Sequence, residues 1–150
     1  DDVSGVTALM YAAQHGHERV VDLLLQRGAD ISLQSSNGLT ALMFAAGQGH
    51  ERVVELLLQR GAQINMQNSN GRTALMAAAC SGHERVVDLL LQRGAEIDPQ
   101  NSCGVTALMG ASQQGHERVV DMLMKHGAEI NKQNSDGGTA LMNAAGFGHP

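Results

Sequence analysis

The chain has 150 residues, about the length of one ordinary domain, and 43% of them are hydrophobic, which is enough for a packed core. The net charge of −5 is small, and acidic and basic residues are interspersed, so the chain lacks the basic stripe that nucleic-acid binding requires. No apolar run approaches about 18 residues, the length expected of a transmembrane helix, and we therefore expect no insertion into a membrane.

The start of the chain and its cysteines bear on the cellular compartment. The first residues, Asp1 to Ser4, do not have the pattern of a signal peptide. Cys80 and Cys103 lie in different local contexts and form no disulfide framework. We expect an intracellular protein, cytoplasmic by default, although a fragment of a longer chain would hide any targeting signal.

A four-residue motif, Thr-Ala-Leu-Met, recurs every 33 residues with no insertion or deletion. The motif begins at Thr7, Thr40, Thr73, Thr106 and Thr139. A fixed period of this length indicates an array of stacked supersecondary units. The sequence predicts one domain whose units cover approximately residues 1–33, 34–66, 67–99 and 100–132, with a partial unit over 133–150.

Each unit begins with a predicted turn and a short helix. In the first unit, Asp2 to Gly5 has the Asp and Gly positions of a type I turn, and the later units keep this chemistry. The hydroxyl of Thr7 can cap a helix over residues 8–14 by accepting a hydrogen bond from a free backbone N–H. Gly16 is expected to end that helix in the left-handed conformation.

A second helix is predicted over residues 18–27, with Gly28 ending it. Arg19 and Asp22, three residues apart on its outer face, are expected to form a weak surface pair. The helix is too short to be stable alone in water, so it must bury its apolar stripe against neighbouring units. We expect much of the stability to come from the leucine triads at 23–25, 56–58 and 89–91.

These motifs resemble the ankyrin repeat, whose pattern the first unit matches from Asp2 to Asp30. The resemblance covers the whole chain. It implies an all-α solenoid of stacked helix–loop–helix units joined by β-hairpin-like loops. It also implies that the chain binds other proteins through a concave surface formed by the loop tips and first helices. The chain departs from the family's Thr-Pro-Leu-His in every copy, and we expect the Met at the fourth position to fill core space.

A comparison of the units with one another indicates where a partner would bind. The second helix hardly varies, whereas the loop tips and first helices do. The resemblance places many of these variable positions on the concave surface, and we predict that a protein or peptide partner contacts Val6, Tyr11, His15, Asn37, Leu39, Phe44, Gln48, Asn70, Arg72, Ser81, Cys103, Val105 and Gln114. Such a surface favours a partner with apolar anchors and a carboxylate for Arg72. Packing between the units is the alternative role for Tyr11 and Phe44.

Seven histidines raise the question of a metal site. Four of them occupy one position in successive units: His17, His50, His83 and His116. Stacked helices lie about 8–10 Å apart, whereas zinc ligands lie about 2 Å from the metal. A ladder of this kind cannot converge on one ion, so we interpret these histidines as structural and expect no metal and no cofactor.

Three hypotheses for the role of the chain follow. The first is a non-catalytic protein–protein interaction module that binds a protein or peptide. The second is a structural rod that associates with itself through its ends, because no unit has the atypical polar sequence of a capping repeat. The third is an engineered or consensus-like array, which near-identical units do not distinguish from recent duplication. No catalytic constellation is visible, and we do not expect an enzyme.

Overall fold

The computed structural model describes residues 4–148, and in this range the chain forms nine α-helices and no strand. The first predicted turn begins at Asp2 and therefore lies partly outside the described residues. The first helices of the repeats are α1 (Ala8–Gln14), α3 (Ala41–Gln48), α5 (Ala74–Ser81), α7 (Ala107–Gln114) and α9 (Ala140–Gly146). The second helices are α2 (Glu18–Gln26), α4 (Glu51–Gln59), α6 (Glu84–Gln92) and α8 (Glu117–Lys125).

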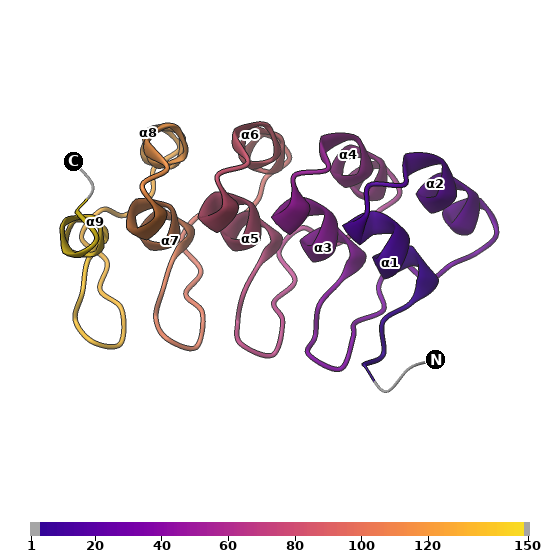
Figure 1. The fold of residues 1–150 in the computed structure, drawn as a ribbon, viewed down its shortest axis with the longest axis horizontal. Coiled ribbons are helices and arrows are strands. Elements are labelled where there is room, and N and C mark those ends of the chain that lie inside the picture. Colours follow the sequence, from indigo (N-terminus) through magenta and orange to yellow (C-terminus); the bar gives the residue numbers. More distant parts are fainter. Residues whose placement is uncertain (1–3, 149–150) are drawn as a thin grey trace.

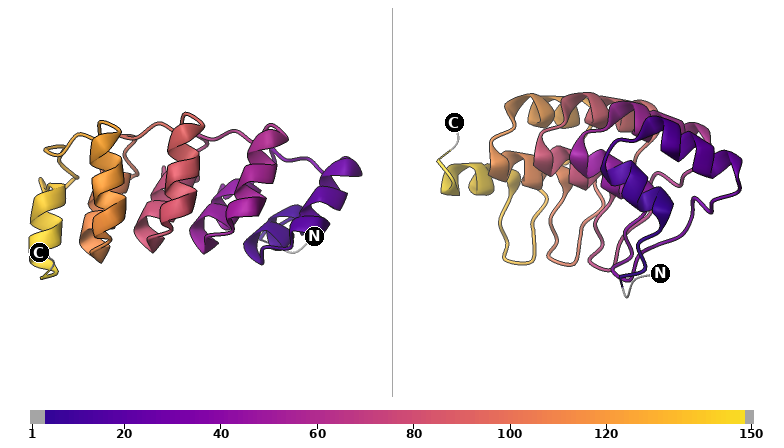
Figure 2. Two further views of the ribbon diagram at one scale, coloured as in Figure 1. Left: turned by 90° about the horizontal axis from the view of Figure 1, so that it is seen from above. Right: turned by 45° about the vertical axis from the view of Figure 1, so that its right-hand side comes forward.

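The helices form two rows, with the loops as a third row beneath them (Figure 1). Each first helix packs against the first helix of the next repeat, and each second helix packs against the next second helix. Seen from above, the successive helix pairs lie side by side along a shallow arc (Figure 2). The chain is thus an all-α solenoid, as the sequence predicts.

Capping threonines and left-handed glycines set the limits of the first helices. The Thr40 hydroxyl accepts a hydrogen bond from the Met43 backbone N–H at 3.2 Å, and the other four repeats have the same cap. Gly49 follows α3 with a φ of 77°, a conformation that costs little only for glycine. Both predictions for the first helices are confirmed.

The loops are hairpin-like without forming strands. In the third repeat, Asn68 and Arg72 pair across the turn, with the Asn68 N–H donating to the Arg72 carbonyl at 2.9 Å. The Gly71 N–H donates to the Asn68 carbonyl at 2.9 Å, which closes the predicted turn. Each loop is also tied to the previous one, because the Ser69 N–H donates to the Asn37 carbonyl at 3.0 Å. The loop tips are therefore held in register along the solenoid.

The core runs between the two rows of helices. The motif methionines Met10, Met43, Met76 and Met109 are buried in it, which confirms their predicted filling role in four repeats. The leucines of the three triads are buried to different extents. Their middle residues Leu57 and Leu90 are fully buried, whereas Leu23 in the first triad is exposed, because the described chain places no helix against that side of α2.

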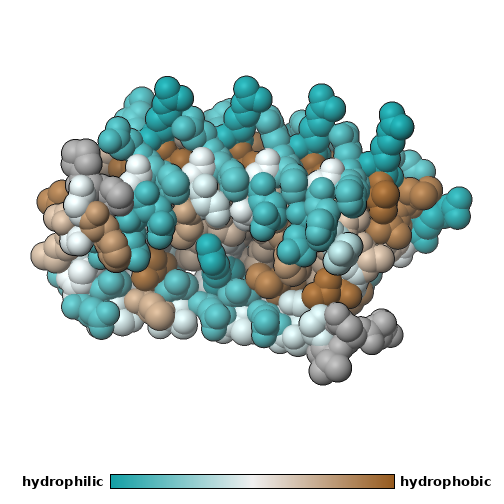
Figure 3. Space-filling model, in the orientation of Figure 1, coloured by the Kyte–Doolittle hydropathy of each residue, from teal (hydrophilic) through white to brown (hydrophobic). Residues whose placement is uncertain are grey.

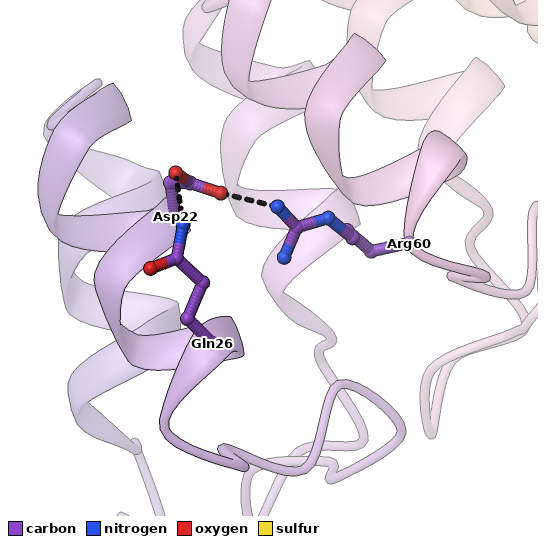
Figure 4. A network of polar contacts seen from close by, with 3 residues as sticks. All are labelled: Asp22, Gln26 and Arg60. Carbon is purple, nitrogen blue, oxygen red and sulfur yellow. Dashed lines mark hydrogen bonds and ion pairs between the residues drawn. The ribbon is translucent and has the colours of Figure 1, made fainter.

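Ion pairs on the outer face, the exposed side of α2, α4, α6 and α8, join one repeat to the next. The predicted pair between Arg19 and Asp22 is wrong. Asp22 instead accepts hydrogen bonds from Gln26 of its own helix and from Arg60, which follows α4 (Figure 4). The stacking brings Arg60, 38 positions further along the chain, closer to the Asp22 carboxylate than Arg19, which lies one turn away in the same helix. Exposed pairs of this kind contribute only about 0–1 kcal/mol each.

Both ends of the described solenoid expose apolar side chains. Val20 and Leu23 are exposed on α2, and Leu141, Met142 and Phe147 are exposed on and after α9. Within residues 4–148, none of the helices has the length and apolar character needed to cross a membrane.

Candidate functional site

A groove lies between the loops and first helices of the second and third repeats. It has a volume of about 500 Å³. Its walls come from the loop tips on one side and from α3 and α5 on the other. We call it the central groove; its main lining residues are Asn37, Leu39, Phe44, Gln48, Asn70, Arg72 and Ser81.

The floor of the central groove is apolar. Leu39 and Phe44 are half-buried and pack against the core, and Ala77 of α5 lies beside them. Gly47 and Ala77 face each other from neighbouring helices, since a Cβ built on Gly47 would lie 3.6 Å from the Ala77 Cβ. Two small residues at this contact leave the space that forms the groove. Hydrophobic side chains gather along this level of the molecule, between the first helices and the loops (Figure 3).

Arg72 supplies the one charge among the described residues that line the central groove. Its position follows from its loop, because the Asn68 side-chain oxygen accepts hydrogen bonds from the backbone N–H groups of Asn70 (3.0 Å) and Arg72 (2.8 Å). An Arg guanidinium on a fixed loop can bind a carboxylate through two parallel hydrogen bonds. The rim is completed by the neutral side chains of Asn37 and Gln48.

Arg72 also lines a neighbouring groove of about 370 Å³ on the third and fourth repeats. Cys80 lies in this groove, and burial raises the pKa of its thiol, an effect that the charge of Arg72 and a hydrogen bond from Arg72 partly oppose. A thiol with a raised pKa stays protonated at neutral pH and is a poor nucleophile. Cys80 therefore acts as a neutral part of the groove wall.

The structure brings together most of the residues predicted to bind a partner. The seven residues that define the central groove are all among them, and Cys103, Val105 and Gln114 line the neighbouring groove. The three predicted residues of the first repeat lie outside both grooves. Tyr11 is 59% exposed, with its ring centroid 4.5 Å from that of His15, so it does not pack between the repeats. Val6 is half-buried against the core.

Sequence reasoning missed several residues of the grooves. Gly47, Ala77 and Cys80 were absent from the predicted set, although all three occupy positions that vary between the repeats. Their small side chains offer no contact chemistry that would single them out. The relevant signal is side-chain size. Ala77 occupies the position that holds Tyr11 and Phe44 in other repeats, and its small side chain leaves a hollow there.

The repeated histidines have a structural role. The Nε2 atoms of His50 and His83 form hydrogen bonds to the carbonyls of Gln14 (2.9 Å) and Gly47 (3.0 Å), at the end of the preceding repeat's first helix. His116 bonds in the same way to the Cys80 carbonyl at 3.0 Å. Among the residues that the structure describes, no three His, Cys, Asp or Glu side chains gather in a way that could hold a metal ion.

Comparison with known proteins agrees with the repeat architecture. A family model described as ankyrin repeats (3 copies) matches residues 1–35 and 9–101, and one described as ankyrin repeats (many copies) matches residues 109–150. A search of curated proteins finds no match to the chain.

Proposed function

The chain belongs to the ankyrin repeat family, whose repeats generally mediate protein–protein interactions, and from this premise we propose that it is a non-catalytic module that binds a partner protein or peptide in the central groove. The observation that carries the proposal is the position of the variable residues. The second helices are nearly identical from repeat to repeat, whereas many of the residues that differ in the second, third and fourth repeats line two neighbouring grooves that share Arg72.

The chemistry of the central groove indicates the kind of segment it would accept. Leu39 and Phe44 offer apolar surface that a partner's aliphatic or aromatic side chain can cover, and such anchors usually dominate an interface. Arg72 at the rim suits a partner carboxylate placed beside that anchor. Asn37 and Asn70 can exchange hydrogen bonds with the partner's backbone. We therefore propose a peptide segment with one large apolar residue close to an Asp or Glu.

A peptide selection tests this proposal. The immobilised chain is used to select ligands from a random peptide library, and the affinity of each selected ligand is measured by fluorescence anisotropy. The double substitution Leu39→Asn with Phe44→Ala should weaken binding at least about tenfold, or about 1.4 kcal/mol. Arg72→Glu should weaken the ligands that carry a carboxylate and spare the neutral ones.

The matched control lies on the outer face. Arg52 and Glu55 take part in exposed pairs with neighbouring repeats, so Arg52→Ala with Glu55→Ala should leave both the fold and the affinity nearly intact. Circular dichroism checks the groove variant, because Phe44 also packs against the core. Loss of binding in the outer-face variant, with binding retained in the groove variant, would place the interaction on the opposite side of the solenoid.

A second candidate function is self-association through the ends. It is supported by the exposed apolar side chains of Val20 and Leu23 at one end and of Leu141 and Phe147 at the other. A rod of this kind should show an average mass that rises with protein concentration in light scattering, and Leu141→Ser with Phe147→Ser should abolish the rise. A constant monomer mass across the concentration range would remove this candidate.

A further inference from the structure

The loop tips, which lie in one row beneath the helices (Figure 1), have a glycine at the same place in every repeat. Gly38 and Gly71 show why. Their φ angles are positive, at 76° and 73°. A Cβ added to Gly38 would lie 2.8 Å from the Ser69 backbone nitrogen, and one added to Gly71 would lie 3.0 Å from the Asn101 Cα. The fold therefore fixes this glycine, because only glycine adopts the conformation freely and leaves room for the next loop.

The residue before that glycine is not fixed. It is Asn37 in the second repeat and Asn70 in the third, whereas the other repeats have Ser4, Cys103 and Asp136. The chain thus contains two Asn-Gly sequences, and both asparagines line the central groove.

An asparagine followed by glycine is chemically labile, because glycine has no side chain to hinder attack by its own backbone nitrogen. In the third repeat, the deprotonated Gly71 nitrogen attacks the Asn70 Cγ. A bond from the Gly71 nitrogen to Cγ forms, the Cγ–Nδ2 bond breaks, and Nδ2 leaves as ammonia with the proton that the glycine gave up. Water then opens the cyclic succinimide at Cγ to give aspartate, or at the backbone carbonyl carbon to give isoaspartate. The reaction consumes water, releases ammonia and needs no oxidant or reductant.

The structure leaves both asparagines open to this reaction. Asn37 and Asn70 are exposed, and neither side chain makes a hydrogen bond among the residues that the structure describes. By contrast, the side-chain oxygens of Asn68 and Asn101 each accept two backbone N–H groups. The Gly71 N–H is restrained by a hydrogen bond of 2.9 Å to the Asn68 carbonyl. One exposed bond of this kind slows the reaction by about two- to twelvefold and does not prevent it.

The fifth repeat shows that the aspartate product fits the turn. The Asp136 N–H donates to the Asn134 side-chain oxygen at 3.0 Å, which is the contact that the Asn70 N–H makes with Asn68, also at 3.0 Å. Isoaspartate fits less well, because it lengthens the main chain beside the Asn70 carbonyl, which accepts a hydrogen bond of 2.8 Å from the Ser102 N–H. Conversion to aspartate therefore adds a negative charge and keeps the loop.

We propose that Asn37 and Asn70 are sites of spontaneous deamidation, and that the carboxylate formed at Asn70 lowers the affinity of the central groove for acidic ligands. Asn70 lies two residues before Arg72 in the same turn, and the Asn68 side chain holds the backbone of both. The new carboxylate competes with a ligand carboxylate for the Arg72 guanidinium. The effect on binding rests on the proposed function of the groove, whereas the chemical step does not.

Peptide mapping by mass spectrometry tests the chemical step. The folded chain, and the chain unfolded in guanidinium chloride, are incubated at mildly alkaline pH, and deamidation of each asparagine is followed over time. In the folded chain, Asn37 and Asn70 should react before Asn68 and Asn101, about two- to twelvefold more slowly than in the unfolded chain. Asn70→Gln should abolish the reaction at this position alone, because the longer side chain cannot close the same ring.

Two results would overturn the chemical step. One is earlier deamidation of Asn68 or Asn101 in the folded chain. The other is an absence of deamidation at Asn37 and Asn70 when the unfolded chain has reacted completely.

The substitution Asn70→Asp tests the effect on binding, because it supplies the product directly. It should weaken the carboxylate-bearing peptides selected on the immobilised chain about three- to fivefold and leave the affinity of neutral selected peptides unchanged. Asn131→Asp is the matched control, since it adds the same charge outside both grooves and should change neither affinity. Circular dichroism checks that both variants are folded.

The outcomes separate this inference from the proposed function. An unchanged affinity of the acidic peptides for folded Asn70→Asp, or an equal loss with Asn131→Asp, would overturn the effect on binding. If deamidation occurs at Asn37 and Asn70 but no selected peptide binds in the central groove, the proposed function is wrong and the effect on binding is wrong with it, while the chemical step is confirmed.

Discussion

Replacement of Leu57 by Ala tests how the stack is stabilised. Leu57 is fully buried in the contact that α4 makes with the core. The substitution removes about three methylene equivalents at about 0.8 kcal/mol each, and the cavity that remains adds a further penalty. We expect a total loss of about 3–4 kcal/mol, within the range of about 2–5 kcal/mol usual for such changes.

Urea denaturation followed by far-UV circular dichroism measures this loss. With a slope of about 1–3 kcal/mol per molar urea, the transition midpoint should fall by about 1–4 M. Leu24→Ala makes the same chemical change at the equivalent position of the first repeat, where the side chain is only half-buried, and should cost clearly less. Gln59→Ala on the exposed side of α4 should change stability by no more than about 0.5 kcal/mol. Equal midpoints for the three variants would refute our assignment of buried and exposed helix faces.

Four further predictions concern a glycine contact, the reactivity of the cysteines, the pH dependence of stability and metal ions. Gly49→Ala should lower the melting temperature more than Gly61→Ala. Both glycines have a positive φ, but only at Gly49 would an added Cβ meet another residue, since it would lie 2.5 Å from the His83 ring. Equal losses of melting temperature would argue against that contact. Cys103, which is exposed, should react with a thiol reagent faster than Cys80, whose pKa is raised by burial. The raised pKa also means that Cys80 loses its proton at a lower pH in the unfolded chain than in the folded chain. The free energy of unfolding should therefore fall as the pH rises beyond 9.0, the ordinary thiol pKa, and a rise there would contradict this. Excess chelator should leave the melting temperature unchanged, and a drop of several degrees would reveal a structural metal.

Most of the fold could be predicted from the sequence because its determinants are local. Thr7 caps α1 and Gly16 follows its end, and both signals lie within a few residues of the boundary they set. The predicted second helix differs from α2 only at its last residue. Contacts between repeats were harder to predict. The pair of Asp22 with Arg60 depends on how one repeat is placed on the next, and no periodicity within a helix encodes that placement.

The candidate site could be predicted in part. Leu39, Phe44 and Arg72 occupy positions that differ between repeats whose second helices hardly differ, and their side chains are large enough or charged enough to bind a partner. The structure places all three in one groove. The depth of that groove was not predictable from them. The depth comes from Gly47 and Ala77, whose small size leaves space open at the contact between α3 and α5.

Hydrogen exchange with and without a bound ligand tests the central proposal most directly. The protein is measured alone and saturated with a selected peptide, and the slowing of each backbone amide is compared. The account predicts slower exchange in residues 37–48 and 68–81, which form the central groove, and unchanged exchange in α4 and α6 on the outer face. Slowing confined to α4 and α6, with residues 37–48 and 68–81 unaffected, would contradict it.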